Sequence, residues 1–80
     1  MPQTILRLPT VKAATGLSRS TLYLRIANGV FPHPVSLGGR AVGWPAHEVA
    51  ALNAARIAGK PEAEIRAMVS QLEAARKAAL

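Results

Sequence analysis

The segment 18–28 combines an apolar side with a polar and basic one. With 100° of helical rotation per residue, Leu22 and Ile26 lie about 40° apart and define the buried side. The exposed arc beside it holds Arg19, Ser20, Tyr23 and Ala27. A guanidinium contacts guanine or phosphate, and serine and tyrosine hydroxyls reach bases or phosphates. The pattern predicts a helix that enters a major groove; the alternative is an ordinary solvated face.

A second candidate contact is Arg40, which follows Gly38-Gly39 between two short apolar segments, 35–37 and 41–44. Two glycines tolerate the positive φ of a two-residue loop, so we expect a β-hairpin with Arg40 at its tip. Alternation predicts one face that holds Val35, Leu37, Val42 and Trp44. Residues 9–28 predict two helices joined by a short glycine-containing turn, and a basic hairpin directly after such a helix-turn-helix is typical of a winged helix, whose wing contacts backbone or minor groove. The alternative is a plain tight turn.

Charge is distributed unevenly along the 80 residues, whose formal net charge is +6. Residues 1–44 contain no acidic residue and five basic ones, which are Arg7, Lys12, Arg19, Arg25 and Arg40. Residues 45–80 contain five basic residues and four glutamates, so the two parts carry +5 and +1. A basic segment of the chain that has no carboxylate is suited to bind a polyanion such as DNA. We expect Arg7, Lys12 and Arg25 to contact its phosphates. The alternative is a charge that serves solubility alone.

The periodicity of the apolar residues and the positions of glycine and proline predict four helices, at about residues 9–15, 19–28, 46–58 and 62–79. The first, with Val11 and Ala14 inward, ends at Gly16, and Ser18 caps the second. Glu48 lies in the first turn of the third helix, where the helix dipole favours an anion. The inner stripe of that helix is Val49, Leu52 and Ala55. The predicted fold is mainly α with a small β-hairpin: a winged helix-turn-helix plus a C-terminal amphipathic helix.

The C-terminal helix is amphipathic, because apolar residues recur at three- and four-residue spacing. These residues are Ile65, Met68, Val69, Leu72 and Ala75. The helix either folds back as core or projects as a dimerisation helix, and we favour a protein–protein contact. The side chains expected to make it are Ile65, Met68, Val69 and Leu72. The chain then divides into a winged helix-turn-helix DNA-binding domain, residues 1–58, and a contact helix, residues 59–80.

Three segments, GLSRSTLY at 16–23, GVFPHPV at 29–35 and LGGRAVGW at 37–44, precede the pair Glu48-Val49. In this order they resemble the AlpA family of small DNA-binding proteins from phages and mobile elements, related to excisionases and to MerR-type winged helices. The resemblance covers about residues 5–57. It implies a transcriptional regulator or an excisionase (recombination directionality factor). By the family pattern, the recognition helix holds Arg19, Ser20, Thr21 and Tyr23, and the wing holds Arg40.

The chain departs from the family pattern on the predicted recognition helix. The family commonly has a basic residue where Leu24 stands and an apolar one where Arg25 stands, so the two look exchanged. Leu24 is expected to be exposed unless it touches thymine methyl groups or a neighbouring protomer. The stem of Arg25 is expected to pack on the flank of the core while its head reaches a phosphate. Family members also often carry charge where Ala27 and Val30 stand.

Other chemistries find little support in the sequence. Without cysteine there is no disulfide and no thiolate nucleophile. His33 and His47 lie in separate predicted elements, which gives no metal-ligand spacing. Ser18 is explained as a helix cap and no loop is suited to cradle phosphate, so we expect neither an enzyme nor a cofactor. No apolar run approaches the ~20 residues of a membrane helix, and we expect a cytoplasmic protein at the nucleoid, with no membrane partner.

The sequence favours a sequence-specific duplex DNA-binding protein that acts as an excisionase, a transcription regulator or both. Besides duplex DNA, we expect self-association or cooperative binding on DNA, and an integrase is a further candidate partner. The alternative is a small helical protein-interaction adaptor with non-specific nucleic-acid affinity. Binding at ~150 mM salt separates the two, because a specific reader exceeds its own non-specific affinity by about 10³ or more.

Overall fold

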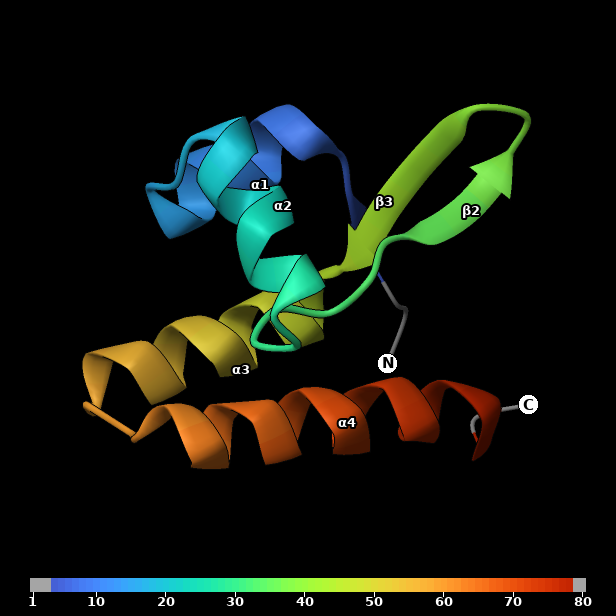
Figure 1. Cartoon of the computed structure of the whole chain (residues 1–80). Helices are drawn as coiled ribbons and strands as arrows, with labels where there is room; N and C mark the ends of the chain where they lie inside the picture. The colour runs from blue at the N-terminus through green and yellow to red at the C-terminus, as the bar shows by residue number, and fades with distance from the viewer. Residues whose placement is uncertain (1–3, 79–80) are drawn as a thin grey trace.

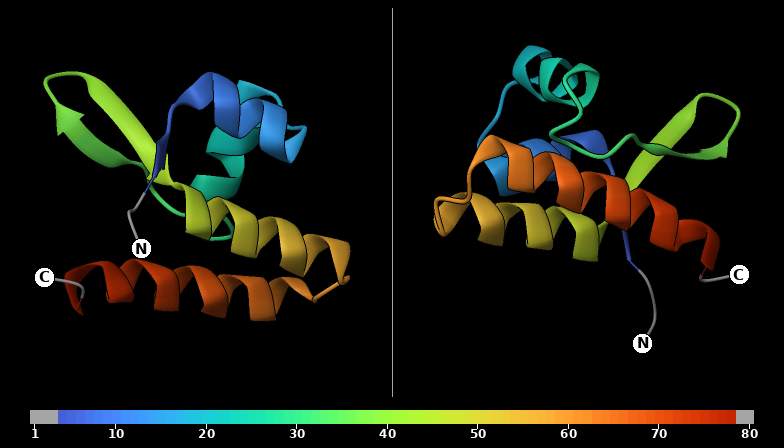
Figure 2. Two further views of the ribbon diagram at one scale, coloured as in Figure 1. Left: turned by 180° about the vertical axis from the view of Figure 1, so that it is seen from behind. Right: turned by 60° about the horizontal axis from the view of Figure 1, so that its bottom comes forward.

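A computed structural model of the protein describes residues 4–78, which form a mainly α-helical, winged-helix-like fold (Figure 1). In chain order the elements are β1 (Ile5–Leu6), α1 (Leu8–Thr15), α2 (Arg19–Ala27), β2 (Val35–Gly38), β3 (Ala41–Pro45), α3 (Ala46–Ile57) and α4 (Glu62–Ala78). Helices α1 and α2 and the β2–β3 hairpin stand on one side of α3. Helix α4 runs along the other side, antiparallel to α3 (Figure 2). The predicted fold class is confirmed.

The first two helices form the predicted helix-turn-helix. Gly16 ends α1 in the left-handed region at φ +71°, and its N–H bonds to a carbonyl one turn back. Ser18 caps α2 as predicted, because its Oγ accepts a hydrogen bond from the Thr21 N–H at 3.2 Å. Val11 is buried, but Ala14, predicted to face inward, is exposed. Ala14 is rotated about 60° from Val11 and lies beyond the packed side of this short helix.

Three short strands form an antiparallel sheet in the order β1-β3-β2. The pairing of the N-terminal segment with the hairpin was not predicted: Ile5 lies opposite Pro45, and Leu6 opposite Trp44. Gly43 permits this close approach, because a Cβ there would collide with Ile5 Cγ2 and lie 2.9 Å from Leu6 O. Strand β1 thereby ties the N-terminal segment to the base of the hairpin.

The β2–β3 hairpin differs from the prediction by one residue. Its paired residues are Val35 with Gly43, Ser36 with Val42, and Gly38 with Ala41. The ladder is irregular between Ser36 and Gly38, so Leu37 is an extra residue on β2. The turn residues are therefore Gly39 and Arg40, not the two glycines that were predicted. Both glycines have positive φ as expected, and Arg40 is exposed at the tip.

The extra residue changes which side chains share a face of the hairpin. The sequence predicted one common face for Val35, Leu37, Val42 and Trp44. That prediction is wrong. Paired residues share a face and neighbours alternate, so Val35, opposite Gly43, points away from the side on which Trp44 is buried. Leu37 reaches over Gly43 on the same side as Val35 and stays 44% exposed.

One hydrophobic core joins the four helices. Its buried side chains are Val11, Leu22, Ile26, Val30, Phe31, Trp44, Val49, Leu52, Ala55, Ile65 and Val69. The inner stripe predicted for α3 is confirmed. Trp44 packs edge-on against Phe31, with ring centroids 6.4 Å apart. Because Ile65 and Val69 belong to α4, the boundary predicted at residue 58 separates two parts of one packed core.

Candidate nucleic-acid interface

The acidic side chains are confined to one part of the fold. All four glutamates belong to α3 and α4. Residues 4–45, which we call the cationic lobe, hold β1, α1, α2 and the hairpin, with five basic residues and no carboxylate. Helices α1 and α2 and the hairpin lie on one side of α3, and α4 lies on the other (Figure 1). The side formed by α1, α2 and the hairpin therefore carries basic side chains and no carboxylate.

Helix α2 exposes the arc predicted from its periodicity. Leu22 and Ile26 are buried. The exposed residues of the helix are Arg19, Ser20, Tyr23, Leu24 and Ala27. Leu24 is 60% exposed, which agrees with the expectation that it points away from the core. The exposed surface of α2 therefore carries one charge, from Arg19, beside hydroxyl and apolar groups.

Arg19 and Tyr23 lie together on the side of α2 nearest the sheet. Arg19 Cζ is 5.3 Å from the centroid of the Tyr23 ring, within the range of a cation–π contact. The Tyr23 ring meets Trp44 edge-on, with centroids 6.4 Å apart and planes at 69°. Because Trp44 belongs to β3, this stack fixes α2 against the hairpin strand and holds a cation at its outer end.

Thr21 takes part in the cap of α2. Its Oγ1 accepts a hydrogen bond from Ser18 Oγ at 3.0 Å, while its N–H donates to the same serine oxygen. The Thr21 side chain is half-buried. The structure thus gives Thr21 a role at the helix start, and a contact with nucleic acid stays a prediction.

The other predicted phosphate contacts lie at separate places on the cationic lobe. Arg7, just before α1, and Lys12, within α1, are both exposed, and Arg40 is exposed at the hairpin tip. Arg25 is half-buried, as expected from the packing of its stem, and lines a cavity of about 230 Å³ together with Arg56. The structure thus brings Arg19 onto Tyr23 and leaves Arg40 on a different element.

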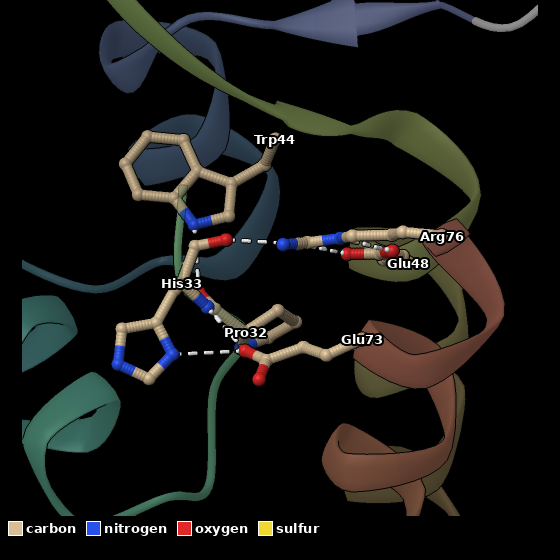
Figure 3. Close-up of polar contacts among 6 residues, drawn as sticks. All are labelled: Pro32, His33, Trp44, Glu48, Glu73 and Arg76. Atoms are coloured by element: carbon tan, nitrogen blue, oxygen red, sulfur yellow. Dashed lines mark hydrogen bonds and ion pairs between the residues drawn. The ribbon is translucent and has the colours of Figure 1, made fainter. Parts of the chain in front are cut away.

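A polar cluster between the α2–β2 loop and α4 was not predicted (Figure 3). Glu48 of α3 is 0% exposed, and Arg76 of α4 donates to both its oxygens, from Nε at 2.9 Å and Nη2 at 2.6 Å. Arg76 Nη2 also donates to the backbone oxygen of His33 at 2.8 Å. Glu73 Oε2 accepts from the His33 N–H at 2.7 Å and lies 2.9 Å from His33 Nδ1. We call Glu48, Arg76, His33 and Glu73 the loop clasp.

Trp44 holds the same loop from the core side. Its indole Nε1 donates to the backbone oxygen of Pro32 at 2.9 Å, and both residues are buried. Two consecutive carbonyls of the loop are thus fixed, that of Pro32 by β3 and that of His33 by α4 (Figure 3). Because this loop sets where the hairpin starts relative to α2, the clasp and Trp44 position the predicted recognition helix against the predicted wing.

The clasp shifts the pKa of two of its members. Burial alone would raise the pKa of Glu73, but the His33 N–H and ring and the charge of Arg76 outweigh it and lower that pKa below its usual value of 4.5. The hydrogen bonds to Glu48 raise the pKa of Arg76, against an opposing effect of burial. Both shifts favour the charged forms, so the clasp is held together by ionised groups.

Sequence reasoning paired Glu48 with the dipole of its helix and did not connect it to Arg76 or His33. Glu48 does lie in the first turn of α3, and Arg76 in the last turn of α4. The missed signal is their spacing. Glu48 lies four residues before Leu52 on the inner stripe of α3, and Arg76 lies four residues after Leu72 on the stripe of α4. An acid and a base that continue two facing apolar stripes indicate a buried pair.

The apolar stripe of α4 packs within the domain. Ile65 and Val69 are buried, and Met68 and Leu72 pack against the same core. The structure therefore has the fold-back arrangement. The protein–protein contact predicted for these four side chains cannot be made by Ile65 and Val69 in this arrangement, because the domain's own core covers them. Ala75, the fifth residue of the stripe, is exposed.

Within residues 4–78, no group of three or more His, Cys, Asp or Glu side chains could hold a metal ion. His33 pairs with Glu73, and His47 is exposed on α3. The helices of the same part of the chain also lack the combined length and hydropathy needed to cross a membrane.

Comparisons with known proteins agree with the resemblance seen in the motifs. The chain is 54% identical over 55 residues to an uncharacterised protein, ORF88, of Enterobacteria phage P4; the match covers 69% of this chain and 62% of that relative. The chain thus spans less than two thirds of the relative's length. No solved structure matches the chain. The family model described as prophage CP4-57 regulatory protein (AlpA) matches residues 4–57, which include the cationic lobe and α3 and leave α4 outside. The chain therefore belongs to the AlpA family of prophage regulatory proteins.

Proposed function

We propose that the protein binds duplex DNA sequence-specifically and acts as an excisionase, a transcription regulator or both. The cationic lobe carries this proposal, because α2 and the tip of the hairpin stand on the side from which carboxylates are excluded. Duplex DNA is a dense polyanion whose major groove admits one helix. Membership of a family of prophage regulatory proteins supports a role on DNA.

In this mode of binding, α2 enters the major groove with Arg19, Ser20 and Tyr23 toward the DNA. The Tyr23 ring keeps the Arg19 guanidinium close to the helix, which lowers the entropy lost when the guanidinium binds a base or a phosphate. A guanidinium matches guanine O6 and N7, and a serine hydroxyl contacts either a base or the backbone. The Tyr23 hydroxyl reaches a phosphate.

The remaining cations supply affinity rather than base specificity. Arg40 contacts the backbone or the adjacent minor groove, as the tip of a wing does. Arg7, Lys12 and Arg25 neutralise phosphates and fix the register on the duplex. Because bacterial DNA lies in the nucleoid, a protein that binds it acts in the cytoplasm, at the nucleoid.

The two uses of such a protein differ in how many sites they need. A regulator occupies one or two sites over a promoter. An excisionase occupies a row of adjacent sites beside an attachment site, with cooperative binding between copies and an integrase as partner. An 80-residue chain covers one short site, so a second copy raises its specificity in either use.

The test combines selection from a random duplex pool with footprinting, both at ~150 mM salt. We expect one sequence class to be enriched and bound about 10³-fold or more above random DNA. Footprints on DNA around the protein's own gene then separate the uses: evenly spaced sites at an attachment site indicate an excisionase, and one or two promoter sites indicate a regulator. A pool in which nothing is enriched would contradict the proposal and favour an adaptor with non-specific affinity.

A further inference from the structure

Leu24 is a large apolar side chain at the centre of the exposed surface of α2, with 60% of its area exposed. The core packing does not use it, and neither does the Arg19–Tyr23 stack. We propose that Leu24 reads the 5-methyl group of a thymine in the major groove. This inference rests on the proposed function and names the base chemistry that α2 recognises.

The position of Leu24 on the helix makes it the residue that enters deepest. Leu22 and Ile26 mark the buried side, and Leu24 lies about 160° around the helix from each of them. A helix that docks with its buried side toward the protein must therefore place Leu24 nearest the floor of the groove. A base edge at the floor meets this side chain before it meets Arg19, which lies toward the flank.

The neighbours of Leu24 leave room for a close approach. Around α2, Ser20 and Ala27 lie about 40° and 60° from Leu24 on one side, and Thr21 lies about 60° from it on the other. All three have short side chains. The base edges of the major groove offer hydrogen-bonding groups and one apolar group, the methyl of thymine. An isobutyl side chain cannot hydrogen-bond, so thymine is the base that it favours.

A second protein molecule is a poorer partner for Leu24. Stable protein interfaces bury roughly 800 Å² on each partner, and the exposed neighbours of Leu24 on α2 are small or polar. Among the residues that the structure describes, the other exposed large aliphatic side chains are Ile5, Leu37 and Ile57, which belong to other elements. Two cationic lobes would also repel each other, because neither contains a carboxylate.

The experiment scans a duplex that the unmodified protein has enriched from a random pool. Each thymidine is replaced in turn by deoxyuridine, which removes the methyl group and keeps every hydrogen-bonding group. The dissociation constant of each duplex is measured for the unmodified protein and for Leu24→Ala. Ile57→Ala is the matched control, because Ile57 is 88% exposed at the end of α3. Circular dichroism checks that the variants keep their helix content.

We expect one or two thymidines at which deoxyuridine weakens binding of the unmodified protein by about fourfold, the loss of one methyl-sized contact. At those positions Leu24→Ala should bind both duplexes equally, while Ile57→Ala should behave as the unmodified protein does. If no position separates the unmodified protein from Leu24→Ala, the inference is wrong. A different result, in which the selection enriches no duplex at all, would contradict the proposed function itself.

A second variant tests the same contact by a gain of function. Leu24→Arg places a cation at the centre of α2, so selection should shift from thymine to guanine at the methyl-sensitive position. An unchanged preference at that position would place Leu24 outside the base-reading surface. A loss of cooperativity in Leu24→Ala without any change in deoxyuridine sensitivity would likewise overturn the inference and assign the side chain to a contact between copies.

Discussion

Glu48 is a fully buried carboxylate. A carboxylate taken out of water costs several kcal/mol unless its charge is paired and its oxygens are hydrogen-bonded. Arg76 supplies a donor to each oxygen, and among the described residues no buried side-chain nitrogen or oxygen lacks a partner. The pair lies 28 residues apart in the chain, so a charge on α3 depends on the docking of α4.

Arg76→Met keeps an apolar stem and leaves the Glu48 carboxylate buried without its cation. We expect the free energy of unfolding, measured with urea at neutral pH, to fall by about 3–5 kcal/mol. The double variant Glu48→Met with Arg76→Met should recover most of the loss, because no buried charge remains. Lys77→Met is the exposed control and should change stability by less than about 0.5 kcal/mol. Equal, small effects at Arg76 and Lys77 would contradict the buried pair.

Glu73 makes stability depend on pH through its contacts with His33 and Arg76. Its pKa is lower in the folded protein than the usual 4.5, so its ionised form stabilises the fold above about pH 4.5. This contribution is lost as the pH falls through the folded pKa. The unfolding free energy of the protein should therefore exceed that of Glu73→Gln at neutral pH, and the difference should shrink below about pH 4.5. Urea titrations over this range check it, with Glu64→Gln as control. A difference independent of pH would show that ionised Glu73 makes no special contact.

Arg19 is the side chain on which base readout in the proposed function depends most. Arg19→Ala should weaken binding to the selected duplex by roughly 1–3 kcal/mol and relax the preference at one base pair. Fluorescence anisotropy titrations at ~150 mM salt measure both effects, with Lys60→Ala, exposed between α3 and α4, as the control. A loss that is equal for all sequences would assign Arg19 to a phosphate instead of a base.

At the scale of elements, the helices were predictable because their signals are local. Gly16 and Ser18 mark a helix end and a helix start, and the periodicity of α2 predicted its exposed arc. The register of the hairpin was not predictable, because the extra residue Leu37 leaves no mark on an alternating pattern. The loop clasp was missed because it joins residues 28 to 43 positions apart, which no local pattern encodes. The Arg19–Tyr23 pair follows from α2 alone, whereas its support by Trp44 depends on tertiary packing.

Gly43 is the position at which the docking of β1 can be tested. In Gly43→Ala, the added methyl collides with the Ile5 side chain and approaches the Leu6 carbonyl, so β1 must move away from β3. We expect a loss of about 1–3 kcal/mol in unfolding free energy and faster amide hydrogen exchange at residues 5 and 6. The double variant Gly43→Ala with Ile5→Ala should lose less than the two single variants together, because one clash is removed. Unchanged exchange at residues 5 and 6 would show that β1 does not dock there.

At the scale of the whole molecule, the arrangement of charge matters more than its total. The formal net charge is +6, and the cationic lobe holds five of the ten basic residues and no carboxylate. The molecule measures 34 × 29 × 23 Å along its principal axes, whereas salt at physiological strength screens charges beyond about 8 Å. The potential at the hairpin tip and at the start of α2 is therefore set mainly by the lobe itself, whereas Arg66 of α4 and Arg56 of α3 lie beside the C-terminal end of α2.

Two variants, each with two charge-reversing substitutions, distinguish the effect of the charges on the cationic lobe from the effect of the net charge. Arg19→Glu with Arg40→Glu and Lys60→Glu with Lys77→Glu each change the formal net charge from +6 to +2. All four side chains are exposed, so both variants should keep the stability of the parent within about 1 kcal/mol. Only the lobe variant should lose DNA affinity, and the slope of its log affinity against log salt should fall by about one, because the phosphate contact of Arg40 is gone. Anisotropy titrations at several salt concentrations measure both quantities. Equal losses in the two variants would mean that DNA responds to the total charge, and that α2 and the hairpin tip do not form the contact surface.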